Sequence, residues 1–156
     1  MQILLSNRQR RHRIRSGQLK KVAARILSDL GCPEGTELSI SIVGDRAIRR
    51  INRDYLNRDR PTNVISFSLQ EGECGAIPSL ALGDVVISAD TALREAEEGG
   101  MEFFERLCFL LLHGTLHLCG YDHERSGEEE AARMEAREVE LFSVLKNEGL
   151  LSQTGS

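Results

Sequence analysis

The protein has 156 residues, of which 40% are hydrophobic and 28% charged, with a formal net charge of −4 at pH 7. A chain of this size forms one globular domain, and a second domain is not expected. The longest apolar run, residues 107–112, is far shorter than the roughly 20 residues of a membrane-spanning helix, and the first residues do not have the order of a secretory signal. We therefore expect a cytoplasmic protein without membrane contact.

The first half of the chain is predicted to alternate strands with helices. Residues 2–6 read as a short strand, and apolar residues at helical spacing predict a helix between Ser16 and Gly31. Apolar residues alternate with serines over residues 38–42, which is typical of a half-buried strand. A second helix begins at Asp45. The side chains that this helix is expected to bury are Ala47, Ile48, Ile51 and Tyr55.

The second half begins with two predicted strands, residues 64–69 and 80–88, which we expect to be neighbours in a sheet. A short helix from Asp90 ends at Gly99 and Gly100, and residues 101–119 then form a helix that is apolar nearly all round, as in a central buried helix. Its Cys108 and the following Cys119 are interpreted as reduced, apolar fillers. Residues 128–147 form an amphipathic helix, whose predicted inward side chains are Ala131, Met134, Phe142 and Leu145.

These elements predict an α/β fold, with helices packed on a small mixed sheet around the central buried helix. We expect one domain over residues 1–151 and a frayed tail over residues 152–156.

Charge is distributed unevenly along the chain. Residues 1–60 carry 14 Lys and Arg against 6 Asp and Glu, whereas residues 61–156 carry 6 against 18. A basic half on an acidic protein indicates an anionic partner that one face binds. The chain has no Trp, 2 Tyr and 5 Phe, so base stacking is not expected to be the main binding interaction, whereas contact with phosphates is.

Three of the four histidines fall within eleven residues at the end of the central helix. His113 and His117 are four residues apart, so on a helix their imidazoles project from one face and can share a metal ion. Gly120 permits a sharp turn that brings His123 back toward them. Three nitrogen ligands with an open fourth position for water are typical of catalytic zinc. His12, among the N-terminal arginines, does not belong to this pattern.

The metzincin proteases have the same ligand spacing, with a glutamate as general base directly after the first histidine. Here that position is Gly114, which argues against peptide hydrolysis. The sequence then predicts that metal-bound water does the chemistry, for example by attacking a phosphodiester or deprotonating a ribose hydroxyl. Asp122 and Asp84 are candidates for proton transfer or for support of the metal ligands, with capping or solvated acids as the alternative.

A second candidate site consists of arginines on the helix that begins at Asp45. They recur on one stripe, opposite the apolar face, and are followed by two more; we expect nucleic-acid contact from Arg46, Arg49, Arg50, Arg53, Arg58 and Arg60. An ordinary solvated basic face is the alternative. A further cluster near the N-terminus contains Arg8, Arg10, Arg11, Arg13 and Arg15.

The sequence resembles the YbeY endoribonucleases, bacterial rRNA maturation factors, over nearly its whole length. The resemblance rests on His113-Gly-Thr-Leu-His117-Leu-Cys-Gly-Tyr-Asp-His123, Pro61-Thr-Asn-Val-Ile-Ser-Phe67 and Gly83-Asp84-Val-Val-Ile-Ser88. It implies a zinc-dependent, single-strand-specific endoribonuclease that matures the 3′ end of 16S rRNA and takes part in ribosome quality control. His113, His117 and His123 would be the zinc ligands, and an rRNA precursor and the ribosome the partners.

One position departs from the family pattern. The family generally has an arginine directly after the tyrosine that corresponds to Tyr55, whereas this chain has Leu56.

Two alternatives to an endoribonuclease stay open from the residues alone: a metallohydrolase of another substrate class, and a non-catalytic RNA-binding module with a structural metal.

Overall fold

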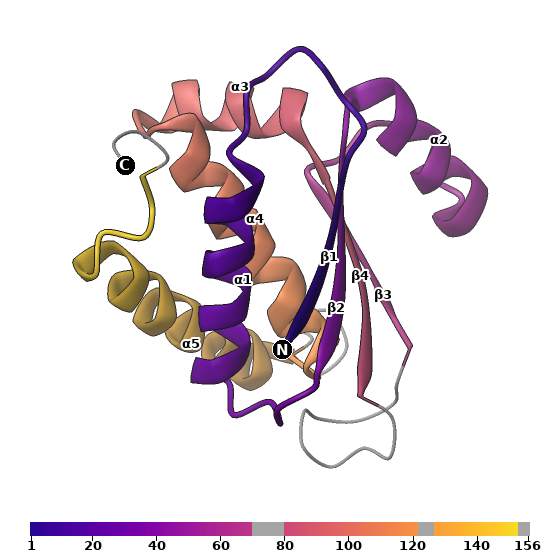
Figure 1. Ribbon diagram of the computed structural model, residues 1–156. Coiled ribbons are helices and arrows are strands. Elements are labelled where there is room, and N and C mark those ends of the chain that lie inside the picture. The colour runs from indigo at the N-terminus through magenta and orange to yellow at the C-terminus, as the bar shows by residue number, and fades with distance from the viewer. Residues whose placement is uncertain (70–79, 122–126, 153–156) are drawn as a thin grey trace.

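A computed structural model describes residues 1–69, 80–121 and 127–152 of the chain (Figure 1). The strands within these residues are β1 (Gln2–Asn7), β2 (Glu37–Val43), β3 (Val64–Ser68) and β4 (Ala81–Ser88). The helices are α1 (Ser16–Asp29), α2 (Asp45–Leu56), α3 (Ala89–Gly99), α4 (Phe103–Leu118) and α5 (Gly127–Asn147). Each predicted element is present, and the predicted ends lie within two residues of the observed ones.

The strands form one mixed sheet in the order β1-β2-β4-β3. β1, β2 and β4 are parallel, whereas β3 runs antiparallel to β4. The prediction that the third and fourth strands are sheet neighbours is confirmed, with Phe67 opposite Asp84 and Ile65 opposite Val86. Among the described residues, β3 pairs with β4 alone, so it is an edge strand.

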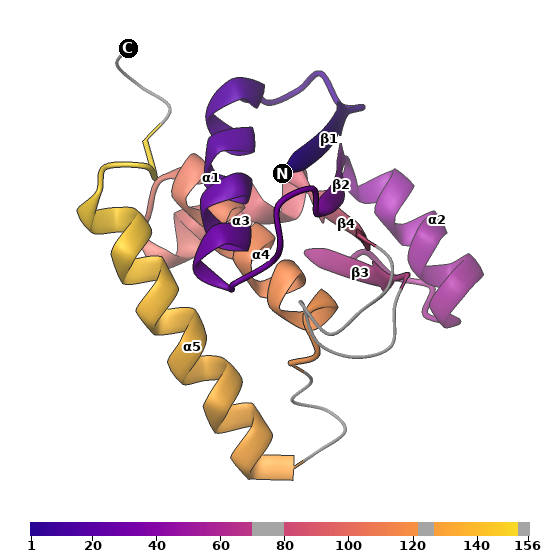
Figure 2. The same ribbon diagram turned by 60° about the horizontal axis from the view of Figure 1, so that its bottom comes forward.

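Helices cover the two faces of the sheet unequally (Figures 1 and 2). On the face that we call the α4 face, α1 and α4 pack against the sheet, and α5 packs on these two helices. Together with the start of α3 they bury a large core that includes Ile26, Ile40, Leu111 and Leu145. On the opposite face, the α2 face, the described helices contribute only α2. A much smaller apolar cluster lies beneath it and consists of Val43, Ile48, Ile65 and Val86.

The helix α4 is the predicted central helix, and 10 of its 16 residues are buried. Cys108 and Cys119 are both buried, as apolar fillers should be, and burial raises the pKa of the Cys108 thiol. Gly120 follows the helix with φ +97°, in the left-handed region that a glycine reaches without steric cost. The predicted sharp turn of the chain at Gly120 is therefore confirmed. Among the described residues, no helix is long and apolar enough to span a membrane.

The prediction for Tyr55 is wrong, because its side chain is 71% exposed. Ile48 is fully buried and Ile51 partly buried, but α2 ends at Leu56 and reaches only a limited part of the sheet. Periodicity places Tyr55 on the same side of the helix as these residues, yet it meets only Phe67, at the edge of the apolar cluster. In α5, Met134 and Leu145 are buried as predicted. The predicted tail begins at Ser152, and residues 153–156 lie outside the described residues.

Candidate functional site

The two central histidines lie in the last two turns of α4 with their rings close together. The His117 Nε2 lies 3.3 Å from the His113 Nε2, and the ring centroids are 4.8 Å apart. Two nitrogens bound at about 2.0–2.1 Å to one tetrahedral zinc ion lie roughly 3.3–3.4 Å apart. The pair therefore has the spacing of two ligands of a single ion.

A buried carboxylate that the sequence analysis missed contacts the His113 ring at Nδ1, the nitrogen that does not face His117. The Oε2 of Glu138, on α5, lies 2.9 Å from the His113 Nδ1, and Glu138 is only 9% exposed. A carboxylate at Nδ1 sets the tautomer and the ring orientation of a histidine ligand, so that Nε2 is the nitrogen turned toward a metal. Its signal in the sequence is an acidic residue in the apolar stripe of α5, four residues after Met134 and three before Leu141.

The glycine between the histidines is explained by packing. A Cβ on Gly114 would lie 2.8 Å from the Val85 Cγ1 and 3.0 Å from the Ser66 Oγ, so a side chain there would force α4 away from the sheet. The Ser66 hydroxyl also donates a hydrogen bond of 2.9 Å to the Gly114 carbonyl. Position 114 thus faces β3 and β4, and a base at this position would point into the sheet.

A cleft of about 470 Å³ opens beside the two histidines. Its walls come from α2, from the segment that follows α2, from β3 and from α4; the residues that line it are Asn52, Leu56, Arg58, Arg60, Thr62, Asn63, Val64, Ile65, Ser66, His113 and His117. Most of the Pro61–Phe67 motif therefore lies on the cleft wall. The fold brings two predicted nucleic-acid-binding arginines, Arg58 and Arg60, to the same cleft as two predicted metal ligands.

Hydrogen bonds fix the backbone of the segment that carries these arginines. Asn57 ends α2 in the left-handed conformation with φ 58°. The buried Asn52 donates its amide to the Arg60 carbonyl at 2.9 Å, and the Arg58 amide donates to the Asn52 carbonyl at 3.2 Å. Asn52 is thus a positioning residue that sequence reasoning missed, although a polar residue four positions after Ile48, on the apolar side of α2, was a usable signal.

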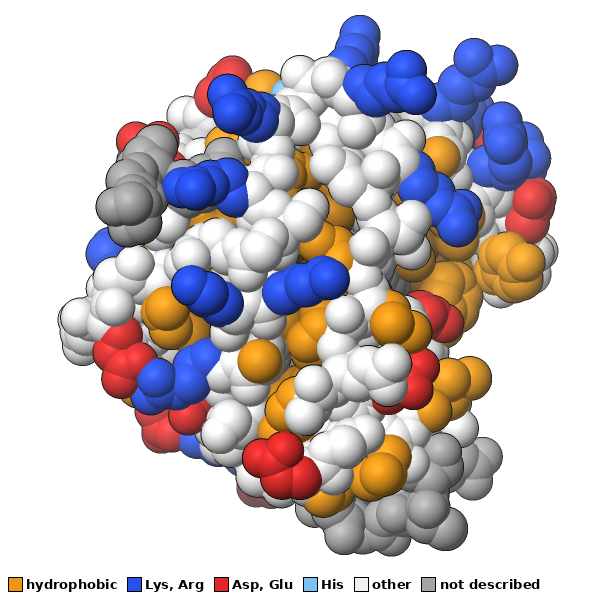
Figure 3. All heavy atoms as spheres, viewed as in Figure 1, with side chains coloured by type: hydrophobic (Ala, Val, Ile, Leu, Met, Phe, Trp, Pro, Cys, Tyr) orange, Lys and Arg blue, Asp and Glu red, His pale blue; other side chains and the backbone are white. Residues whose placement is uncertain are grey.

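The other four candidate arginines lie on α2 and are not among the residues that line the cleft. Arg46, Arg49, Arg50 and Arg53 are exposed, and Figure 3 shows Lys and Arg side chains gathered over α2 and over the segment that follows β1. The Arg49 Nε donates to Asp59 at 2.9 Å, and this bond holds the pKa of Asp59 below its ordinary value. We call Arg46, Arg49, Arg50 and Arg53 the α2 stripe.

The N-terminal arginines lie on the segment between β1 and α1, and all five are exposed. Within this segment, the His12 Nε2 lies 2.8 Å from the Asp90 Oδ1, while the Asp90 Oδ2 accepts a hydrogen bond from the Asp45 amide. His12 therefore ties this segment to the starts of α2 and α3. Its exclusion from the predicted metal site agrees with this contact.

Of the two acidic candidates, Asp84 faces away from the histidines. Side chains alternate along a strand, and the neighbouring Val85 points to α4 near Gly114 whereas Val86 belongs to the α2 cluster. Asp84 shares the side of Val86, so its predicted supporting role is not compatible with this geometry.

Asp122 and His123 lie outside the described residues. Among the residues that are described, no group of three or more His, Cys, Asp or Glu side chains is arranged to hold a metal ion. The three-histidine zinc site therefore stays a prediction.

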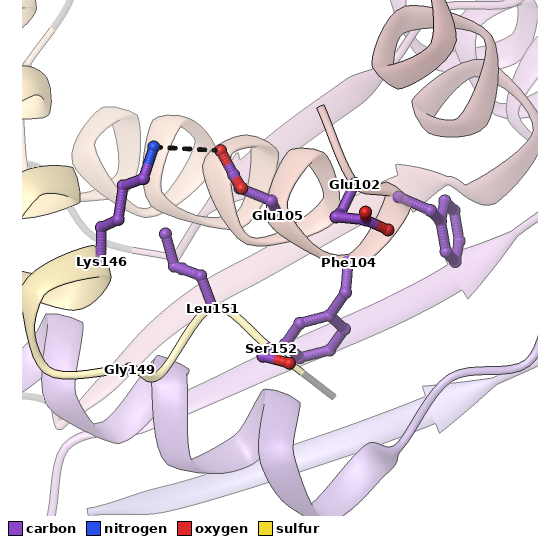
Figure 4. A pocket seen from close by; sticks show the side chains of 8 residues that line it. Glu102, Phe104, Glu105, Lys146, Gly149, Leu151 and Ser152 are labelled. Atoms are coloured by element: carbon purple, nitrogen blue, oxygen red, sulfur yellow. Dashed lines mark ion pairs between the residues drawn. The ribbon is translucent and has the colours of Figure 1, made fainter. Parts of the chain in front are cut away.

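A second cavity, of about 490 Å³, lies between the start of α4 and the end of α5 (Figure 4). Lys146 reaches across it to Glu105, with 3.9 Å between Nζ and Oε2, and Phe104 and Leu151 add apolar wall. It lies at the opposite end of α4 from His117 and contains none of the predicted site residues.

Comparison with known proteins now identifies the family. The family model described as Endoribonuclease YbeY matches residues 4–146. A Geobacter metallireducens protein named Endoribonuclease YbeY is 64% identical over 151 residues, which cover 97% of this chain and 100% of that protein. The chain belongs to the YbeY endoribonuclease family.

Similarity to YbeY proteins extends to more distant bacteria. The Endoribonuclease YbeY of Aquifex aeolicus is 42% identical over 137 residues, covering 88% of this chain and 87% of that protein. The solution structure of TM1509 from Thermotoga maritima matches with a TM-score of 0.61 over 99% of both chains, at 21% identity. This last likeness shows that the α/β fold is shared.

Proposed function

We propose that this YbeY family member is a zinc-dependent, single-strand-specific endoribonuclease that acts in 16S rRNA 3′-end maturation and ribosome quality control. Membership of the family makes it an endoribonuclease, that is, a hydrolase that acts on RNA phosphodiester bonds. The observation that supports the finer assignment is the single cleft shared by His113, His117, Arg58 and Arg60. Metal-binding and phosphate-binding groups side by side suit a phosphodiester substrate.

In this proposal, His113, His117 and His123 hold the zinc ion. The 3.3 Å between the Nε2 atoms of the first two fits a tetrahedral ion, and imidazole nitrogen is a favoured zinc donor. Bound zinc supplies Lewis acidity, which lowers the pKa of water and offsets charge on phosphoryl oxygens. Glu138 acts as a positioning residue because it holds the His113 Nδ1 at 2.9 Å.

The arginines of the cleft bind the RNA backbone. Both arginines, Arg58 and Arg60, carry a guanidinium, whose planar geometry matches two oxygens of one phosphate. Asn52 fixes the backbone of both residues, so their side chains start from defined points on the cleft wall. Asp122 stays our candidate for proton transfer, on sequence grounds.

The same proposal gives the protein a cytoplasmic location and an rRNA precursor and the ribosome as partners. The basic first 60 residues, with 14 Lys and Arg against 6 Asp and Glu, suit a large polyanion. The α2 stripe extends this positive surface beyond the cleft (Figure 3).

Cleavage of defined RNAs tests the proposal. Purified protein is incubated with a labelled single strand and with a blunt duplex of the same sequence, with and without a zinc chelator. We expect cleavage of the single strand only, loss of cleavage with chelator, and recovery on addition of zinc. Protein with His117→Ala, purified in parallel, controls for contaminating ribonuclease. Full activity in the chelated sample would overturn zinc dependence, and RNA binding without cleavage would favour a non-catalytic module.

A further inference from the structure

Tyr55 is unusual among the aromatic residues of this chain because it is the only strongly exposed one. All seven aromatic side chains lie in described segments; Tyr55 is 71% exposed, whereas each of the other six is at least half-buried. The second tyrosine, Tyr121, is covered in part by Arg133, whose guanidinium carbon lies 5.7 Å from the ring centroid. A ring left in water does not contribute the stabilisation that burial would give, so its position beside the cleft is what makes it a candidate for binding.

The ring is held in place next to the cleft. Its centroid lies 5.7 Å from that of Phe67, at an interplanar angle of 71°, so the two rings meet edge to face. A ring with this contact and 71% exposure keeps at least one π face open to solvent. The next residue, Leu56, lines the cleft, and Asn57 then ends the helix in a fixed conformation. Tyr55 is therefore held by Phe67 and by the end of α2, directly beside a residue of the cleft wall.

We propose that Tyr55 stacks against an unpaired nucleobase of the RNA strand bound in the cleft, an inference that rests on the proposed function. The surroundings favour a polyanion, because Arg58 and Arg60 line the neighbouring cleft and the α2 stripe lies on the same helix as Tyr55. An aromatic ring among arginines offers the two contacts that single strands use: phosphate pairing and base stacking.

Stacking at Tyr55 also gives a physical source for single-strand specificity. In a duplex, each base is covered above and below by its neighbours, and its π face is out of reach of a side chain. A strand with unpaired bases can turn one of them onto the ring while its phosphates stay on the arginines. A protein partner would instead have to remove water from several arginines to cover one apolar ring, which is unfavourable.

Tyrosine fluorescence can report on this contact, because the protein has no Trp and only two Tyr. The variant Tyr121→Phe leaves Tyr55 as the only tyrosine and keeps the ring at position 121. Zinc-loaded Tyr121→Phe protein is titrated with a 2′-O-methyl RNA single strand, whose integrity is checked on a gel. We expect the tyrosine emission to be quenched on binding. A strand of equal length and charge that lacks bases should bind without quenching.

Affinity measurements separate stacking from charge. Tyr55→Ala should weaken binding of the single strand roughly 5- to 150-fold, while Tyr55→Phe keeps wild-type affinity because a phenyl ring also stacks. Neither variant should change the salt dependence of binding, since no charge is removed. On the strand without bases, Tyr55→Ala should have no effect.

Two results would overturn the inference: Tyr55→Ala protein that binds the base-containing strand as tightly as wild type, or an equal loss of affinity for the strand without bases. Both presuppose that wild-type protein binds and cleaves single-stranded RNA. If wild type does neither, the proposed function fails first, so the two failures can be told apart.

Discussion

The two faces of the sheet differ in how deeply they are packed and in the residues that they present. On the α4 face, α1, α3, α4 and α5 contribute to a large core, and the histidine pair lies at its border with a fixed neighbour, Glu138. On the α2 face, one helix covers four buried residues and displays arginines and Tyr55 to solvent. The edge strand β3 separates the faces, and the cleft runs beside it.

This difference matches two physical requirements. Metal ligands must be held within a fraction of an ångström, which a densely packed core provides. Contacts to a flexible polyanion tolerate motion, because the Coulomb interaction changes slowly with distance. A thinly covered face is then sufficient, and it leaves charged and aromatic side chains accessible. We therefore expect substitutions on the α4 face to affect metal binding and folding, and those on the α2 face to affect RNA affinity.

The largest effect is expected for His117→Ala. Loss of one of three nitrogen ligands should remove zinc during dialysis against a mild chelator and abolish cleavage, because zinc affinity depends on the full ligand set. Elemental analysis of the dialysed protein measures this. His12→Gln is the matched control, since His12 contacts Asp90 and should not alter zinc content. Full zinc occupancy in His117→Ala would contradict the proposed site, with the nearby Cys119 as the first alternative ligand to test.

Gly114→Glu should destabilise the fold by about 3 kcal/mol or more, because its side chain would be forced between α4 and the strands and its carboxylate would be buried. Cleavage should not increase. Denaturant unfolding measures the loss. Gly17→Glu provides a control with the same chemistry, since Gly17 has open space around it in the first turn of α1, where an acidic residue is favourable. Unchanged stability of Gly114→Glu would show that α4 does not approach the sheet this closely.

Glu138→Gln is expected to weaken zinc binding about 10- to 100-fold, the usual loss when the partner of a histidine ligand is changed. Competition with a fluorescent chelator measures the affinity, and the nitrogen resonances of His113 report its tautomer. Glu135→Gln, on an exposed position of α5, removes the same charge without touching His113. Equal zinc affinities for the two variants would mean that Glu138 only fills space.

The smallest effect is expected for arginines outside the cleft. Each phosphate contact on a single strand contributes roughly −0.7 to the slope of log affinity against log salt, so removing two contacts should reduce the slope by about 1.4. We expect this for Arg58→Ala with Arg60→Ala, and also for Arg49→Ala with Arg53→Ala if the strand continues along the α2 stripe. The loss of affinity should be greater for the cleft pair.

Binding curves at several salt concentrations measure both slopes, and zinc content is the control. An unchanged slope for the Arg49 and Arg53 variant would mean that the α2 stripe is a solvated basic face. The RNA path would then lie along the N-terminal arginines or be confined to the cleft.

The elements, the central helix and the spacing of His113 and His117 were predictable from the amino-acid sequence alone. Each depends on a local pattern: period two for a strand, and 3.6 for a helix, which puts residues four apart on one side. The ring contact of the two histidines follows directly from that spacing. The motifs also identified the family, which the comparisons confirmed.

Contacts between residues that are distant in the sequence depend instead on how the elements pack. Arg58 and Arg60 line the same cleft as the histidines because β3 packs beside α4, and Glu138 contacts His113 because α5 packs on α4. Periodicity predicts which side of a helix is apolar, but it does not predict how much of that side the sheet will cover. Tyr55 is therefore on the expected side and still exposed, since the small α2 cluster ends before it.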